Sequence, residues 1–203
     1  MIRQSGIAAV CLTAVLLFFP ARGLQFFYPE DSFLAVIASQ QPQHRLSVPA
    51  SIATYEKLIR QSADDIGWDW RLVAAVVYHE SRFNNEAQSG KGATGLMQIH
   101  STRYSPDTLL IPTVNLSIGT AYLRRLENMF PAASPRDSLK FALAAFNLGD
   151  GKVKRLIAEA DSAGLDPGRW DQVARILPEG HHTVAYVDKV LKTFDDYSRE
   201  LPH

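Results

Sequence analysis

The sequence predicts a mainly α-helical domain. Apolar residues recur at intervals of three and four over most of the chain beyond residue 50, and no stretch alternates strictly enough to predict a sheet. The 203 residues suit one domain that can bury a hydrophobic core without disulfides. We therefore expect packed helices, with at most a small loop or minor strand pair in a segment rich in glycine.

The first 23 residues have the order of a secretory signal. Arg3 supplies a positive charge, residues 7–19 form an apolar run with Thr13 as its one hydroxyl residue, and Ala21 and Gly23 provide small residues before a cleavage point. A typical transmembrane helix needs about 20 apolar residues, and this apolar run is shorter. We predict an exported protein, periplasmic or in the cell envelope, with an uncleaved inner-membrane anchor as the alternative.

The remainder divides into a lead segment and a main domain. Residues 24–50 end in a stretch of Gln, Pro and Ser that is typical of a linker, so we expect the main domain over residues 51–203. Cys11 is the single cysteine, which excludes an internal disulfide framework. Its place inside the apolar run does not favour lipidation.

The charge balance excludes two classes of protein. The chain has 21 Lys and Arg against 21 Asp and Glu, a formal net charge of zero. This balance argues against a protein that binds nucleic acid by bulk phosphate attraction, and against a polybasic membrane-surface protein.

The first two predicted helices are followed by a loop, and the second of them is expected to be buried. Residues 55–66 have a helical period that Gly67 ends, and Asp69 is a plausible N-cap for the next helix. That helix, residues 70–82, is apolar almost all round, so we expect it to be the central buried helix. Residues 84–98 contain three glycines and are expected to form a loop.

The later helices follow at shorter intervals. Residues 116–129 are expected to be helical, and residues 139–148 are expected to form a helix that Gly149 ends. Asn115 begins a glycosylation sequon, which we interpret as coincidence. The inward face of the first of these is expected to contain Ile118, Tyr122, Leu126 and Met129. The remaining predicted helices are residues 152–160, 170–177 and 184–197.

Glu80 is the strongest candidate for a catalytic group. It lies one turn beyond Val76 and Val77 near the end of the buried helix, where loss of water raises the pKa of a carboxyl group. A carboxyl group with a raised pKa can act as a general acid near neutral pH. The alternative is a structural ion pair with a neighbour such as Arg82.

Other chemistries lack the residues they require. His79 and Glu80 begin a zinc-protease pattern, but Phe83 stands where the second histidine is needed. Residues 181–182 are adjacent histidines, which is weak evidence for a metal, and residues 149–152 lack the pattern of a phosphate-binding loop. We expect neither a metal nor a cofactor.

Four segments in order carry a resemblance to a known family. They are Glu-Ser-Arg-Phe-Asn at 80–84, Ser-Gly-Lys-Gly-Ala-Thr-Gly-Leu-Met-Gln at 89–98, Ala-Ala-Phe-Asn at 144–147 and Thr-Val-Ala-Tyr-Val at 183–187. Over residues 53–197 the chain resembles the lysozyme-like lytic transglycosylases of bacterial cell walls (SLT domain family 1). Within that family, the chain is most similar to the catalytic domain of the membrane-bound lytic transglycosylase F group. This similarity rests on Trp-Asp-x-Val, Leu-Pro and Gly-His between positions 170 and 181.

The resemblance implies a fold and a reaction. The fold is the lysozyme-like helical domain with a substrate cleft beside the buried glutamate. The reaction cleaves the β-1,4 bond from N-acetylmuramic acid to N-acetylglucosamine without water and leaves a 1,6-anhydromuramoyl end. Glu80 would act first as acid and then as base. Most glycosidases use two carboxyl groups. One suffices here if the acetamido group of the sugar stabilises the positive charge and its C6 hydroxyl group takes the place of water.

The resemblance also implies roles for other residues. Met97 and Gln98 would line the cleft, and Asn147 would hydrogen-bond the sugar or its acetamido group. Tyr186 would hold Glu80 in place, and Ser81 would support the acid or the acetamido group. Each residue has a structural alternative: Met97 and Tyr186 could belong to the core, and Asn147 could cap a helix.

Two positions depart from the family pattern. Phe146 stands at a substrate-binding position where the family usually has tyrosine, so a hydroxyl group is missing there. His182 stands where glutamate is usual, which removes an acidic contact. Both departures leave Glu80 and Tyr186 in place, so we expect activity to survive.

The leading hypothesis is therefore an exported peptidoglycan lytic transglycosylase that acts as a monomer on glycan strands. Two alternatives stay open: a muramidase like the goose-type lysozymes, which uses water, and a non-catalytic cell-wall-binding module. A membrane association through residues 1–23 is compatible with each.

Overall fold

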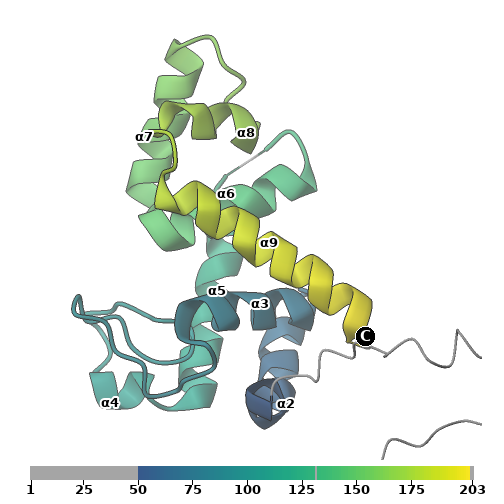
Figure 1. Cartoon of the computed structure of the whole chain (residues 1–203). Coiled ribbons are helices and arrows are strands. Elements are labelled where there is room, and N and C mark those ends of the chain that lie inside the picture. Colours follow the sequence, from purple (N-terminus) through teal and green to yellow (C-terminus); the bar gives the residue numbers. More distant parts are fainter. Residues whose placement is uncertain (1–49, 131, 202–203) are drawn as a thin grey trace, which may run out of the picture. The chain divides into compact units, whose positions relative to one another are not determined.

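A computed structural model describes residues 50–130 and 132–201 of the chain. The predicted signal and almost all of the lead segment lie outside these residues. Within the described part, helices connected by loops form the whole architecture, and no strand occurs (Figure 1). The helices are α2 (Ala50–Asp64), α3 (Trp70–Ser81), α4 (Pro106–Leu109), α5 (Pro112–Met129), α6 (Pro135–Leu148), α7 (Asp150–Ser162), α8 (Trp170–Val173), the 3-10 helix η1 (Ala174–Ile176) and α9 (His182–Glu200).

Local sequence signals explain where several helices begin and end. The Asp69 side chain accepts a hydrogen bond from the Arg71 amide and caps α3, as predicted. Ser134 caps α6 in the same way, and Gly149 closes it with a φ of 96°, a backbone conformation that glycine adopts at little cost. The predicted termini at Asp69 and Gly149 are thus confirmed.

Helix α3 is the centre of the hydrophobic core. Its residues from Trp70 to Val77 are all buried, as the sequence predicts. Helix α9 packs along α3 and also contacts α6, while α5 packs against both α2 and α6 (Figure 1). Because α9 joins α3 to α6, side chains from distant parts of the sequence meet along its length.

The structure corrects the prediction for the helix at 116–129. Helix α5 begins at Pro112, a residue suited to the first helical position because it has no amide hydrogen to leave unpaired. Its fully buried positions include Leu116, Leu123 and Leu126, whereas Tyr122 of the predicted inward face is only half-buried. The buried face is rotated from the predicted one, because a helical period alone does not distinguish two adjacent stripes.

Two smaller differences concern short helices. Helix α4 was not predicted, since four residues carry no detectable period. The helix expected over 170–177 divides into α8 and η1. Among the described residues, no helix is both long and apolar enough to cross a lipid bilayer.

Candidate active site

Glu80 lies in the last turn of α3, at the point where the buried helix reaches the surface. The residues before it are fully buried up to Val77, while Glu80 itself is half-buried. Burial removes water from the carboxyl group and raises its pKa above the ordinary value of 4.5, which is the larger of two effects. The smaller effect is a hydrogen bond from Tyr186, which lowers the pKa again.

Tyr186 makes the one hydrogen bond that the described residues give to the Glu80 carboxyl group. Its hydroxyl group donates to Glu80 Oε1 over 2.6 Å. Burial and the nearby carboxylate raise the pKa of Tyr186 well above its ordinary 10.0, so the phenol remains protonated and acts as a donor. Oε2 accepts no hydrogen bond from the described part of the chain, and is therefore available to carry a proton.

The first turns of α9 connect this pair to α6. Thr183 lies one turn before Tyr186 on the same face of the helix, and its hydroxyl group donates to Asn147 Oδ1 over 2.9 Å. His181 caps the helix, since its Nδ1 accepts from the Thr183 amide. The start of α9 therefore hydrogen-bonds both Glu80 of α3 and Asn147 of α6.

The glycine loop that follows α3 is anchored from α5. Asn115 is fully buried, its Oδ1 accepts from the Met97 amide over 2.8 Å, and its Nδ2 donates to the carbonyl groups of Thr94 and Leu109 over 2.8 Å each. Two isolated bridges, both through Thr94, are the only strand-like pairing of the described residues. The expected minor strand pair is reduced to these bridges.

Comparison with known proteins shows the family of this chain. The transglycosylase SLT domain model matches residues 57–166, more than half of the chain. The chain belongs to the transglycosylase SLT domain family. The resemblance found in the sequence and the predicted mainly α, lysozyme-like fold are both confirmed.

Several known proteins are similar to this chain in sequence. The chain is 34% identical over 163 residues to the membrane-bound lytic murein transglycosylase F of Desulfosudis oleivorans, covering 70% of this chain and 36% of that protein. It is 32% identical over 189 residues to the protein of the same name from Marinobacter nauticus, covering 83% and 37%. The chain thus spans little more than a third of the length of these relatives.

Two solved structures are similar to the described SLT domain. The 70 kDa soluble lytic transglycosylase of Escherichia coli has a TM-score of 0.57 and 30% identity, over 71% of this chain and 24% of that one. An inactive glutamate-to-glutamine mutant of the lytic transglycosylase Slt from Pseudomonas aeruginosa has a TM-score of 0.61 and 25% identity, over 83% and 27%.

The structure brings four of the predicted site residues of this SLT domain onto neighbouring elements. Glu80 and Tyr186 are in direct contact, and Asn147 is joined to α9 through Thr183. Phe146 lies next to Asn147, with its ring tilted against that of Tyr122 at 5.7 Å between centroids. Asn147 does not cap α6, because Gly149 does so.

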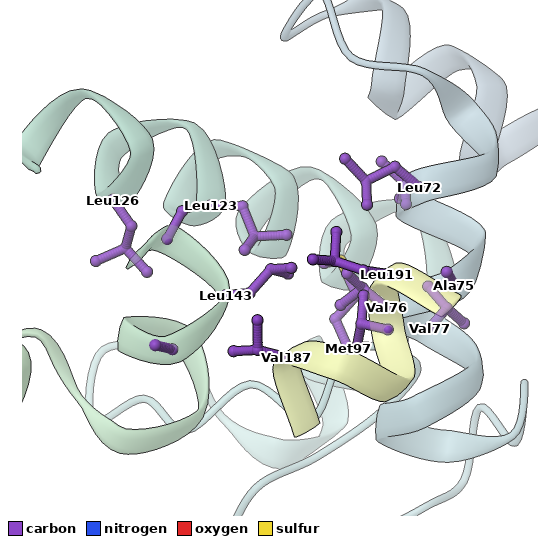
Figure 2. Close-up of a cluster of buried hydrophobic side chains, with 14 of the residues drawn as sticks. Leu72, Ala75, Val76, Val77, Met97, Leu123, Leu126, Leu143, Val187 and Leu191 are labelled. Atoms are coloured by element: carbon purple, nitrogen blue, oxygen red, sulfur yellow. The ribbon is translucent and has the colours of Figure 1, made fainter. Parts of the chain in front are cut away.

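Met97 is placed differently from the prediction that it lines the cleft. Its side chain is fully buried, and Figure 2 shows it in the same cluster as Val76 and Leu191. It packs so closely against Gly119 that a side chain at that position would clash with its sulfur atom. Of the two interpretations that the sequence left open for Met97, the core position is the one observed.

Ser81 and Gln98 direct their side chains to backbone groups. The Ser81 hydroxyl group donates to the Val77 carbonyl over 3.3 Å, and does not hydrogen-bond Glu80. The Gln98 amide donates to the carbonyl groups of Ala87 and Gly95 over 3.0 Å each. Both residues therefore support the local backbone, and their expected contacts with substrate stay predictions.

Asn115 and Thr183 are the two positioning residues that sequence reasoning missed. Asn115 was visible only as a sequon, and its burial depends on a loop that folds back from about 20 positions earlier in the chain. Thr183 belongs to a segment that carries the family resemblance, but nothing in the sequence indicates its bond to Asn147.

His79 takes a structural position. His79 Nε2 hydrogen-bonds Thr193 Oγ1 over 2.9 Å, which ties α3 to α9. The described residues contain no group of three or more His, Cys, Asp and Glu side chains that could hold a metal ion.

Proposed function

We propose that this domain cleaves the glycan strands of peptidoglycan without water, with Glu80 as the only catalytic carboxyl group. The observation that carries the proposal is the half-buried Glu80 with its raised pKa and its single hydrogen bond from Tyr186. The names of the relatives and of the similar structures, all lytic transglycosylases, support the same substrate and reaction.

The reaction balances with one carboxyl group. Protonated Glu80 gives its proton to the oxygen atom that links the two sugars, while the bond between that oxygen and C1 of N-acetylmuramic acid breaks. The substrate's acetamido group stabilises the positive charge at C1. The Glu80 carboxylate then takes the proton of the C6 hydroxyl group, and the C6 oxygen bonds to C1 to form the anhydro ring. Glu80 ends protonated, as it began.

The surroundings of Glu80 suit both steps. A raised pKa keeps the carboxyl group protonated closer to neutral pH, which the first step needs. The Tyr186 hydrogen bond holds Oε1 and stabilises the carboxylate, which the second step needs. The nearest acidic candidate in sequence, Glu86, is exposed in the loop after α3 and is not among the groups that shift the pKa of Glu80.

Mass spectrometry of the soluble products tests the proposal. Purified sacculi incubated with the wild-type chain should release fragments that are one water lighter than hydrolysis products and carry no reducing end. Glu80→Gln should lower the rate by about 10²- to 10⁴-fold, the usual contribution of a general acid. Glu86→Gln is the matched control and should cleave at the wild-type rate.

Three other outcomes of these experiments would contradict the proposal. Products with reducing ends would make the enzyme a muramidase. Sacculus binding without any soluble product would favour a non-catalytic wall-binding module. Loss of activity in Glu86→Gln would show that a second carboxyl group takes part.

We further propose that the chain works in the cell envelope. The predicted signal in residues 1–23 and the membrane-bound relatives support this location. Fractionation of cells that express the full chain would separate a soluble periplasmic pool from a membrane-anchored one, and a cytoplasmic pool would refute the proposal.

A further inference from the structure

Two adjacent residues in the last turn of α3 hydrogen-bond the same neighbouring helix. Glu80 accepts from Tyr186 of α9. His79 is bonded to Thr193 of α9, with 2.9 Å between Nε2 and Oγ1. Tyr186 and Thr193 are two helical turns apart, so they lie on one face of α9, about 10 Å from one another along its axis. The proposed reaction uses the first of these links and gives no role to the second.

A third link fixes the far end of the same pair of helices. Arg71 in the first turn of α3 is buried, and its guanidinium group donates over 3.1 Å to the carbonyl group of Leu201, which follows the end of α9. The two helices therefore run in opposite directions, and the link from His79 to Thr193 lies between this end and the catalytic pair. The links are spaced alike on α3 and on α9, so the two helices are held in one register.

The bond between His79 and Thr193 does not depend on the protonation of the imidazole. Burial is the largest cause that lowers the pKa of His79 below its ordinary 6.5, followed by the positive charge of Arg82. A hydrogen bond with the Lys189 backbone raises this pKa, and the charge of Lys189 lowers it. The ring is therefore neutral at pH 7. Because a hydroxyl group both donates and accepts, Thr193 can bond Nε2 in either tautomer and in the imidazolium form.

The direction of the Tyr186 hydroxyl group depends on the rotation of α9 about its own axis. A side-chain group about 5–6 Å from a helix axis moves by about 1 Å when the helix rotates by about 10°. A movement of this size along the 2.6 Å bond to Glu80 would take the two oxygen atoms beyond hydrogen-bonding distance. Thr193 lies on the same face of the helix, so its bond to α3 opposes this rotation.

We infer that His79 is a positioning residue: through Thr193 it holds α9 in the rotation that directs the Tyr186 hydroxyl group at the catalytic carboxyl group. His79 acts through these two side chains and does not itself contact the glycan. The inference rests on the proposed function, because that reaction is what the bond between Tyr186 and Glu80 serves. The bond itself can be measured without cleavage.

Thr193→Val tests the inference, because it removes the hydroxyl group and keeps the branched shape of the side chain. It should lower kcat/KM for the release of soluble fragments by about 2- to 10-fold, the range of a neutral hydrogen bond. Thr193→Ser keeps a hydroxyl group and should restore most of the rate. A weaker Tyr186 bond leaves burial of Glu80 less opposed, so the fall of activity with rising pH should move to higher pH. In a Tyr186→Phe background, Thr193→Val should have no further effect on either readout.

Thr120→Val is the matched control for a loss of stability alone. The Thr120 hydroxyl group is buried and bonds the carbonyl groups of Leu116 and Ser117 within its own helix, α5. The variant should lower the free energy of unfolding in urea and leave the pH profile of activity in place. A wild-type pH profile in Thr193→Val, or losses that add to those of Tyr186→Phe, would reduce the His79 bond to a contribution to stability and overturn the inference.

An NMR titration of the Glu80 carboxyl carbon separates this inference from the proposed function. It reports the pKa of Glu80 with no substrate present, and both Thr193→Val and His79→Phe should raise that pKa. An unchanged pKa in both variants would overturn the inference even in a chain that cleaves glycan. A wild-type chain that releases no product would overturn the proposed function, whereas the titration would still decide whether His79 positions Tyr186.

Discussion

The hydrogen bond between Tyr186 and Glu80 allows a prediction with two independent readouts. Tyr186→Phe removes only the hydroxyl group that donates to Glu80 Oε1 over 2.6 Å. A hydrogen bond to a charged group contributes about 1.5–3 kcal/mol, so losing it in the step where Glu80 is ionised should lower kcat/KM by about 10- to 150-fold. The fold should be retained, because the ring still packs in the same place.

The second readout is the pH dependence of the same variant. The Tyr186 hydrogen bond lowers the pKa of Glu80, while burial raises it. Removing the hydroxyl group leaves burial unopposed, so the pKa of Glu80 should rise. Because the proposed first step needs protonated Glu80, activity falls as pH rises through this pKa, and this fall should move to higher pH in Tyr186→Phe.

Release of soluble fragments from sacculi, measured as initial rates across the pH range, provides both readouts. Tyr197→Phe is the control, since it removes a phenol hydroxyl group 11 residues further along α9, about 16 Å away. An unchanged rate, or a fall of activity that moves to lower pH, would refute the role assigned to Tyr186.

Three further predictions concern the support of the site. Asn115→Ala leaves the Met97 amide and the Leu109 carbonyl without their partner, while the Thr94 carbonyl keeps the Ile99 amide, so the free energy of unfolding should drop by about 2–6 kcal/mol in urea denaturation. Gly119→Ala forces a methyl group onto the sulfur atom of Met97 and should cost about 1–3 kcal/mol in the same assay. Glu80→Gln should raise the melting temperature at neutral pH, since it removes a carboxylate whose burial opposes ionisation, and the gain should shrink as pH falls towards 4.5.

Each of these variants has a control. Asn128→Ala changes an exposed asparagine on the same helix and should leave stability almost unchanged. Gly151→Ala places a methyl group in open space within α7 and should stabilise slightly. The sign for Glu80 follows from its raised pKa, because a carboxyl group of this kind favours the folded state most when it is protonated. A gain in melting temperature for Glu80→Gln that persists below pH 4 would contradict that explanation.

The sequence by itself determined the catalytic candidate and its setting. The apolar stretch from Leu72 to Val77, preceded by the N-cap Asp69, predicted a buried helix, so Glu80 one turn later was expected at the edge of the core. Asp69 and Gly149 determined a helix start and a helix end through interactions within a few residues. Such features are predictable because the responsible groups are close together in the chain.

The tertiary structure alone decided which way the loop residues face. The glycine loop has no period that could assign a direction to Met97 or Gln98, and the direction follows from Asn115, which reaches back from α5 to hold the loop backbone. A hollow lined by Arg103 and Arg125 likewise combines the segment after the loop with α5. These arrangements depend on groups that meet only when distant segments pack together, which is why no local pattern in the sequence contains them.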